Sequence, residues 1–94
     1  MRRNNLRTPC FVIEEAGLIR NCEILDRVRK NTGCRILLAQ KCFSNYELYP
    51  LLSRFLDGTE ASGLYEAKLG REHMPGECHV FSAAYRDDEF GELL

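Results

Sequence analysis

Lys41 is the residue whose position in this 94-residue chain most favours covalent chemistry. It follows an uncharged run, Ile36–Gln40, whose first four residues are aliphatic. Burial disfavours the charged form of an amine, so an ammonium group at the end of a buried run could lose its proton and act as a nucleophile. A lysine whose charge simply reaches solvent is the competing interpretation, and on position alone the more common case.

Other residues with reactive side chains form weaker patterns. Cys42 adjoins Lys41, whose charge could favour a thiolate, but no histidine is close in sequence to act as a base. His79 is expected to be structural or exposed. Ser62 precedes a predicted helix and could be its cap as readily as part of an anion site. Asp87–Glu89 is typical of an acidic first helical turn rather than of a metal site.

The cysteines indicate reduced thiols. There are five, an odd number, and no two of them form a Cys-x-x-Cys pair. Only two histidines accompany them, so no zinc-ligand spacing is recognisable and we predict no metal. We expect mostly buried thiols that behave as small apolar side chains. They are Cys10, Cys22, Cys34, Cys42 and Cys78.

Composition excludes several classes of partner. Thirteen basic and fourteen acidic residues give a net charge of −1, which argues against a general electrostatic grip on nucleic acid or anionic membranes. No Gly-x-Gly-x-x-Gly or Walker-type loop supports nucleotide binding. No apolar run approaches the ~20 residues that cross a bilayer, and the first residues do not resemble a signal peptide. We therefore expect a cytoplasmic protein.

Alternating strand and helix patterns must position Lys41. Leu18, Cys22, Leu25 and Val28 share one face of a predicted helix that Gly33 ends. Strands are predicted at 10–13, 35–41, 59–62 and 78–82, and further helices from Glu47 or Leu48 (with Ser44 and Glu47 as a capping box), over 64–74, and from Asp87.

This order predicts an α/β protein with a parallel sheet. A complete eight-unit barrel needs about 250 residues, so we expect a partial (β/α)8 barrel, namely its first three βα units after a leading strand. Alternation along the strand places Leu37, Ala39 and Lys41 on one face of the sheet. It places Ile36, Leu38 and Gln40 on the other face.

Five separated motifs resemble the N-terminal part of carboxynorspermidine/carboxyspermidine decarboxylases. These enzymes belong to the alanine-racemase-like, fold-type III group of pyridoxal-phosphate enzymes. The similarity runs from about Thr8 to Leu94, and its most telling segments contain Lys41 and the run Leu64–Gly70. The motifs are Thr8–Phe11, Ile36–Phe43, Asp57–Thr59, Leu64–Gly70 and Asp87–Glu89.

The resemblance implies that Lys41 carries pyridoxal 5′-phosphate as a Schiff base and is both the catalytic and the cofactor-binding residue. It implies decarboxylation of a small carboxypolyamine, carboxynorspermidine or carboxyspermidine, to norspermidine or spermidine in polyamine biosynthesis, by a homodimer. Residues 1–14 would hold the leading strand of a second, β-rich domain, and residues 15–94 the N-terminal part of the barrel. The chain would then be a fragment, inactive alone.

Four residues depart from the pattern that the resemblance implies, and other functions stay open. Gln40 stands where an aliphatic residue is expected, Glu60 replaces an uncharged one, and Ala61 and Gly63 interrupt a run that is usually rich in serine. The alternatives are another fold-type III decarboxylase, acting on diaminopimelate, ornithine or arginine, and a non-catalytic pyridoxal-phosphate-binding protein. A third is a small α/β interaction module.

Overall fold

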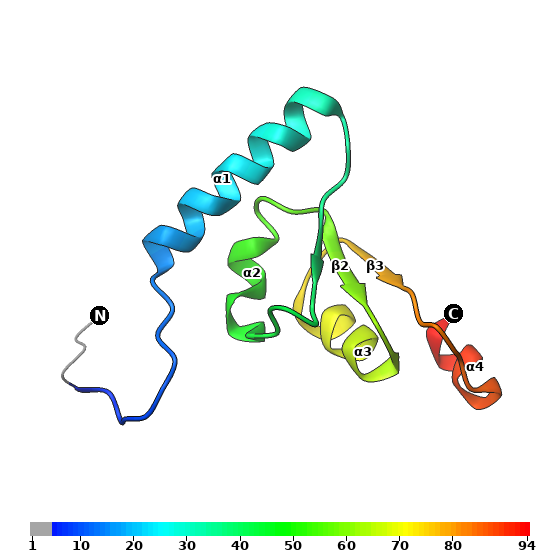
Figure 1. Cartoon of the computed structure of the whole chain (residues 1–94). Coiled ribbons are helices and arrows are strands. Elements are labelled where there is room, and N and C mark those ends of the chain that lie inside the picture. Colours follow the sequence, from blue (N-terminus) through cyan, green and yellow to red (C-terminus); the bar gives the residue numbers. More distant parts are fainter. Residues whose placement is uncertain (1–4) are drawn as a thin grey trace.

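The computed structural model describes residues 5–94 and has the expected α/β class (Figure 1). Met1–Asn4, part of the segment assigned to a leading strand, lie outside the described residues. The elements in chain order are α1 (Glu15–Thr32), β1 (Leu37–Ala39), the 3₁₀ turn η2 (Tyr46–Leu48), α2 (Tyr49–Leu52), β2 (Gly58–Ala61), α3 (Leu64–His73), β3 (Glu77–Val80), the 3₁₀ turn η3 (Asp87–Glu89) and α4 (Phe90–Leu93).

The three strands form one parallel sheet in the order β1-β2-β3. Leu37 lies opposite Gly58, and Gly58 opposite Glu77. Each strand therefore lies beside the one before it, and the chain advances across the sheet in one direction. Because crossovers between parallel strands are right-handed, two successive crossovers in one direction place their helices on the same face of the sheet.

The hydrophobic core lies between this face of the sheet and the helices. Tyr49 of α2 is fully buried, and Ile36 and Leu38 pack against its cluster as the alternation along the strand predicts. The buried members of the cluster are Cys22, Tyr49, Leu52, Leu56 and Met74, and the partly buried ones are Leu18, Ile36, Leu38, Phe43, Phe55 and Leu69.

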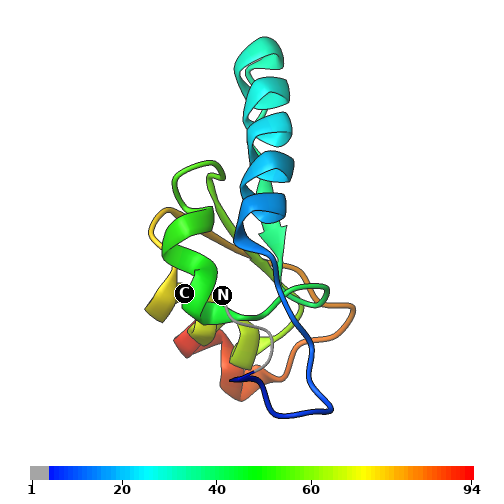
Figure 2. The ribbon, with the colours of Figure 1, turned by 90° about the vertical axis from the view of Figure 1, so that its left-hand side faces the viewer.

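α1 is the longest helix, and only part of its predicted apolar face is covered. Cys22 is buried and Leu18 packs on the core, whereas Leu25 and Val28 are 40% and 45% exposed. The C-terminal half of α1 extends beyond the short strands (Figure 2), which leaves Leu25 and Val28 only partly covered by residues 5–94. Gly33 ends the helix as predicted, with φ at 73° and its N–H donated to Arg29 O.

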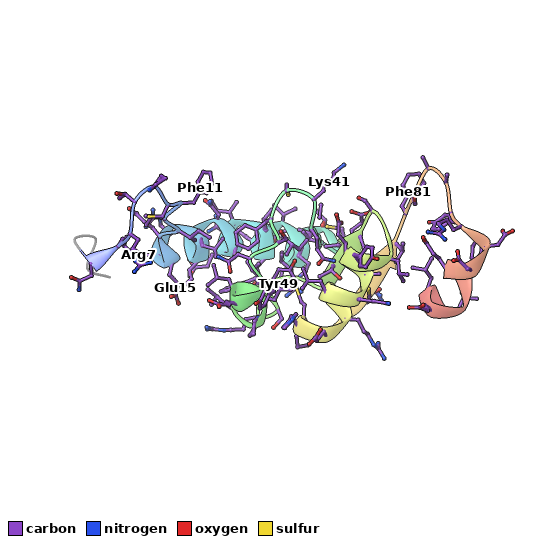
Figure 3. All side chains as sticks on the ribbon, turned by 90° about the horizontal axis from the view of Figure 1, so that it is seen from below. Arg7, Phe11, Glu15, Lys41, Tyr49 and Phe81 are labelled. Atoms are coloured by element: carbon purple, nitrogen blue, oxygen red, sulfur yellow. The ribbon has the colours of Figure 1, made fainter. Side chains whose placement is uncertain are left out.

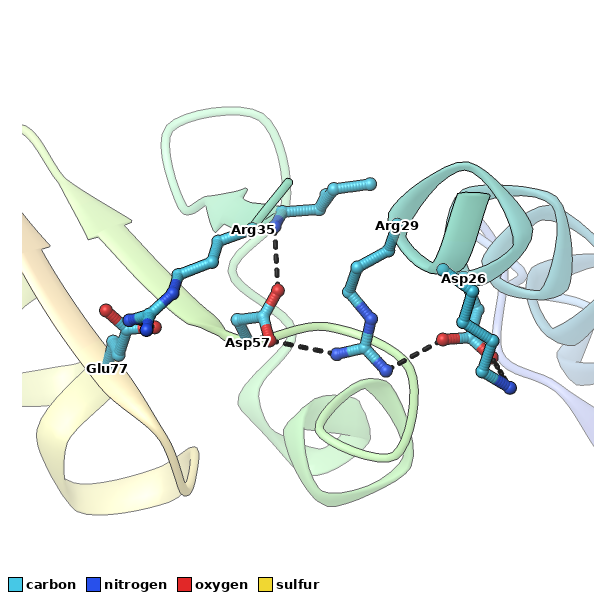
Figure 4. A network of polar contacts seen from close by, with 7 residues as sticks. Asp26, Arg29, Arg35, Asp57 and Glu77 are labelled. Atoms are coloured by element: carbon cyan, nitrogen blue, oxygen red, sulfur yellow. Dashed lines mark hydrogen bonds and ion pairs between the residues drawn. The ribbon is translucent and has the colours of Figure 1, made fainter. Parts of the chain in front are cut away.

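A polar network ties the C-terminal end of α1 to the start of β1 (Figure 4). The Arg29 guanidinium lies 3.0 Å from Asp57 Oδ1 and 2.7 Å from Asp26 Oδ1. The other Asp57 oxygen, Oδ2, accepts the N–H of Ile36 at 2.8 Å. The network fixes β1 at the end opposite to Lys41.

Three local predictions are wrong. The strand at 10–13 does not form, because none of the three strands of the described chain pairs with it, and Phe11 is fully exposed. β1 covers only Leu37–Ala39 of the expected 35–41. The capping box of Ser44 and Glu47 is absent, since the turn begins at Tyr46 and its N-cap, Asn45, makes no side-chain cap bond.

The helix that follows begins close to its predicted start. α2 begins at Tyr49 and places Pro50 in its first turn, where the missing N–H of proline leaves no hydrogen bond unmade.

Within residues 5–94, no helix combines the length and the apolar character needed to span a bilayer.

Candidate functional site

Lys41 lies in the turn directly after β1, at the carboxyl end of the parallel strands, where α/β proteins gather their functional groups. The turn is closed by the N–H of Cys42, which donates to Ala39 O at 3.1 Å. Figure 3 shows the Lys41 side chain projecting away from the ribbon, and the residue is exposed. The burial expected around its amine is therefore not supplied by residues 5–94.

Two polar side chains lie on one face of the sheet, near its carboxyl end. Ala39 lies opposite Glu60, and Glu60 opposite His79, so these three residues form one row on the face away from the helices. Glu60 is half-buried and His79 exposed. A carboxylate and an imidazole thus lie side by side on this face, near the end of the sheet where the turn that contains Lys41 begins.

The His79 side chain contacts Glu77, two residues before it in β3. Its Nε2 lies 3.1 Å from Glu77 Oε1, and Arg35 Nη1 lies 2.6 Å from Glu77 Oε2. The hydrogen bond to His79, together with Arg35, lowers the pKa of the Glu77 carboxyl. This sheet face is therefore polar, unlike the face that packs on the helices.

Gln40, the residue before Lys41, forms a buried polar pair with Tyr49, which the sequence did not reveal as such. Gln40 is 2% exposed. Its Nε2 donates to Glu66 O at 2.8 Å, and its Oε1 accepts the Tyr49 hydroxyl at 2.9 Å. Its backbone N–H donates to Glu60 O at 3.1 Å. The one signal in the sequence was an amide in place of the expected aliphatic residue.

Gly70 of α3 makes room for this pair. A Cβ on Gly70 would lie 2.7 Å from Gln40 Nε2 and 2.4 Å from Thr59 Oγ1. The Thr59 hydroxyl is buried and has no hydrogen-bond partner among the described residues. α3 therefore approaches the sheet most closely where Gln40 and Thr59 lie.

The remaining candidates fall outside this arrangement. The Ser62 N–H donates to Glu66 Oε1 at 3.0 Å, and Gly63, not Ser62, is the N-cap of α3. Cys42 Sγ donates to Ala39 O. Asp87–Glu89 form a short 3₁₀ turn. Residues 5–94 bring together no group of three histidine, cysteine or acidic side chains that could hold a metal.

The cysteines are free, as predicted, but the expectation that most are buried is wrong. Only Cys22 is buried, and the desolvation raises the pKa of its thiol. The other four are exposed because they lie in loops, in a turn or at the edge strand β3, outside the small core.

Tyr49 should make stability depend on alkaline pH. Burial, and then the Glu66 carboxylate, raise the pKa of its hydroxyl. A raised pKa favours the protonated form in the folded state, so this stability is complete below about pH 10, the ordinary tyrosine value, and is lost as pH rises through the folded-state pKa. Tyr49→Phe keeps the ring in the core, and urea unfolding across this range should show a weaker loss at high pH. An unchanged alkaline slope would contradict the assignment.

Comparisons with known proteins find several decarboxylases. The chain is 39% identical over 89 residues to a carboxynorspermidine/carboxyspermidine decarboxylase of Herminiimonas arsenicoxydans, covering 95% of this chain and 24% of that protein. It is 39% identical over 88 residues to the protein of the same name from Campylobacter jejuni, covering 94% and 23%. It is 36% identical over 93 residues to a carboxyaminopropylagmatine decarboxylase of Synechocystis, covering 99% and 24%. No family model matches.

A solved structure agrees with these relatives. The crystal structure of carboxynorspermidine decarboxylase complexed with norspermidine, from Campylobacter jejuni, superposes with a TM-score of 0.91 at 39% identity, covering 94% of this chain and 24% of that one. The chain spans about a quarter of the length of the relatives it matches. The resemblance drawn from the sequence motifs is thereby confirmed, and the chain is homologous to a quarter-length segment of the carboxynorspermidine/carboxyspermidine decarboxylases.

Proposed function

We propose that this chain is part of a pyridoxal-phosphate-dependent decarboxylase that converts carboxynorspermidine or carboxyspermidine to norspermidine or spermidine. The observation that carries the proposal is the place of Lys41. It lies at the carboxyl end of β1, in a chain that superposes on a carboxynorspermidine decarboxylase with a TM-score of 0.91. The same proposal includes a small carboxypolyamine as substrate, a homodimer and a cytoplasmic location.

The strand order supports a partial (β/α)8 barrel as the context of the site. A barrel adds its strands one after another with all helices outside, which is the pattern of β1-β2-β3. Under this proposal residues 15–94 are the first three βα units. Segment 1–14 belongs to a second domain, in keeping with the exposure of Phe11 and the absence of a partner strand for 10–13 in the described chain.

The residues at the carboxyl edge fit the cofactor in their chemistry. Lys41 would hold pyridoxal phosphate covalently through Nζ, and Glu60, with a charge opposite to that of a polyamine, lies beside Ala39, two residues before Lys41. When bound, the cofactor supplies an electron sink for the pair released by the departing carboxylate. The protein's part is to fix the amine of Lys41 and to orient the substrate against it.

Borohydride reduction of the complete enzyme tests the attachment site. After reduction and digestion, we expect a pyridoxyl label on the peptide that contains Lys41. The same preparation should release carbon dioxide from carboxynorspermidine or carboxyspermidine. A label on another peptide, or none, overturns the cofactor assignment. Labelled Lys41 without decarboxylation of any carboxypolyamine or diamino acid would instead favour a non-catalytic pyridoxal-phosphate protein.

A second substrate has a specific observation in its favour. The relative named carboxyaminopropylagmatine decarboxylase aligns with 99% of this chain at 36% identity, only slightly below the other two relatives. This compound should therefore be assayed beside the two carboxytriamines. The higher kcat/KM decides which one is the substrate.

A further inference from the structure

Gln40 is a buried polar residue among aliphatic neighbours. Its side-chain amide is almost completely buried in a position where the neighbouring residues of the strand are aliphatic. Burying an amide costs free energy unless its hydrogen bonds are restored within the protein. A methionine or leucine here would supply apolar burial but would remove a hydrogen-bond partner of the buried Tyr49 hydroxyl and of the Glu66 carbonyl.

The amide joins three elements at one point. Its Nε2 donates to the carbonyl of Glu66 in α3, and its Oε1 accepts from the hydroxyl of Tyr49 in α2. Its backbone N–H donates to Glu60 O of β2. Both ends of the side-chain amide are therefore satisfied, and the residue is held by hydrogen bonds from side chain and backbone alike.

Gln40 is also the last residue before Lys41, and it is held by hydrogen bonds to other elements. β1 ends at Ala39, and the bond from Gln40 N–H to Glu60 O lies just beyond that end. After it the chain turns, and Lys41 is exposed within that turn. With a strand of only three residues beneath it, the Lys41 backbone depends on the anchoring of the residue next to it.

We propose that Gln40, held by Tyr49, is a positioning residue that fixes the backbone of Lys41 for reaction. This inference rests on the proposed function, because it assigns a geometric task to the amine on which that function depends. A displacement of about 1 Å at a reacting group can cost about 100-fold in rate. Loss of the amide should therefore lower kcat more than it changes KM.

Gln40→Glu in the complete enzyme is the sharpest test, because it nearly preserves shape. A protonated carboxyl can accept from the Tyr49 hydroxyl and donate its O–H to Glu66 O, as the amide does. The ionised carboxylate has no donor and would face the Glu66 carbonyl with a lone pair. We expect the ratio of variant to wild-type kcat to approach one at low pH and to fall by about 10- to 100-fold as the carboxyl ionises.

The ionisation of other titratable groups around this position must be distinguished from that of the new carboxyl. They are Tyr49 of α2, Glu66 of α3 and Glu60 of β2, with Lys41 next in the chain. All of them are present in the wild type, so the ratio of the two profiles removes their direct contributions. The Glu66 carboxylate is moreover engaged by the Ser62 N–H.

Two further variants and a control complete the test. Gln40→Met should lower kcat by about 10-fold or more and shift the absorption spectrum of the bound cofactor. It should also lower the melting temperature, because the Tyr49 hydroxyl and the Glu66 carbonyl lose a buried partner, so kcat is measured well below that temperature. Tyr49→Phe should have a smaller effect, and the double variant should be no worse than Gln40→Met alone, because both act through one bond. Asp57→Asn, at the other end of β1, should lower stability and leave kcat and spectrum unchanged.

The outcomes separate this inference from the proposed function. If wild-type enzyme is not labelled at Lys41, the proposed function fails. If it is labelled and active, but Gln40→Met retains kcat and spectrum, or Gln40→Glu follows the wild-type pH profile, the positioning role is overturned. Should Gln40→Met not fold, Gln40→Glu at low pH and Tyr49→Phe still decide the matter.

Discussion

Replacing Lys41 with alanine will reduce decarboxylation by the complete enzyme by about 1,000-fold or more. The chain has no second amine at the carboxyl end of its strands, since its other lysines, Lys30 and Lys68, lie on helices α1 and α3. Loss of the nucleophile removes the covalent step rather than weakening it. Steady-state release of carbon dioxide, with borohydride labelling of the same sample, measures both effects.

The other two lysines provide matched controls for this prediction. Lys30 pairs with Asp26 at 3.0 Å on the surface of α1, and Lys68 pairs with Glu92 at 2.6 Å. Such exposed pairs contribute little to stability, so Lys30→Ala and Lys68→Ala should keep activity and label near the wild-type level. Substantial activity in Lys41→Ala, or its loss in either control, would refute the assignment of Lys41.

Gly58→Ala is expected to destabilise the fold by about 3 kcal/mol. Gly58 lies in the central strand β2, between Leu37 and Glu77. A Cβ there would lie 1.9 Å from Glu77 O and 2.6 Å from Glu77 N. Both are backbone atoms that no side-chain rotation can move, so β3 would have to separate from β2. Urea unfolding of the variant measures the loss.

Gly17→Ala is the control variant, and it should change the stability in the opposite direction. Its Cβ would meet only the Arg20 side chain, at an ordinary 3.5 Å. Alanine is favoured over glycine within a helix by roughly 0.5–1 kcal/mol, so this variant should become slightly more stable. If Gly58→Ala unfolds at the same urea concentration as wild type, the close approach of β2 and β3 described here is incorrect.

Local sequence patterns predicted most of the elements because they depend on short-range physics. The Gly33 cap and the apolar spacing of Leu18 and Cys22 predicted helix α1. The uncharged run before Lys41 predicted a strand there, although β1 is only half-buried in the described chain. The strand at 10–13 failed because a strand also needs a neighbour, and the sequence of one segment does not show whether a partner exists.

The sequence by itself determined the α/β class, the parallel character of the sheet and the place of Lys41 at a strand end. Only the tertiary structure decided what surrounds that lysine. The strand register places Glu60 and His79 beside Ala39, two residues before Lys41, and Gln40 meets Tyr49 and Glu66 through the packing of α2 and α3. Periodicity encodes which face of an element is buried. Contacts between residues 26 positions apart, such as Gln40 and Glu66, arise only when the elements pack together.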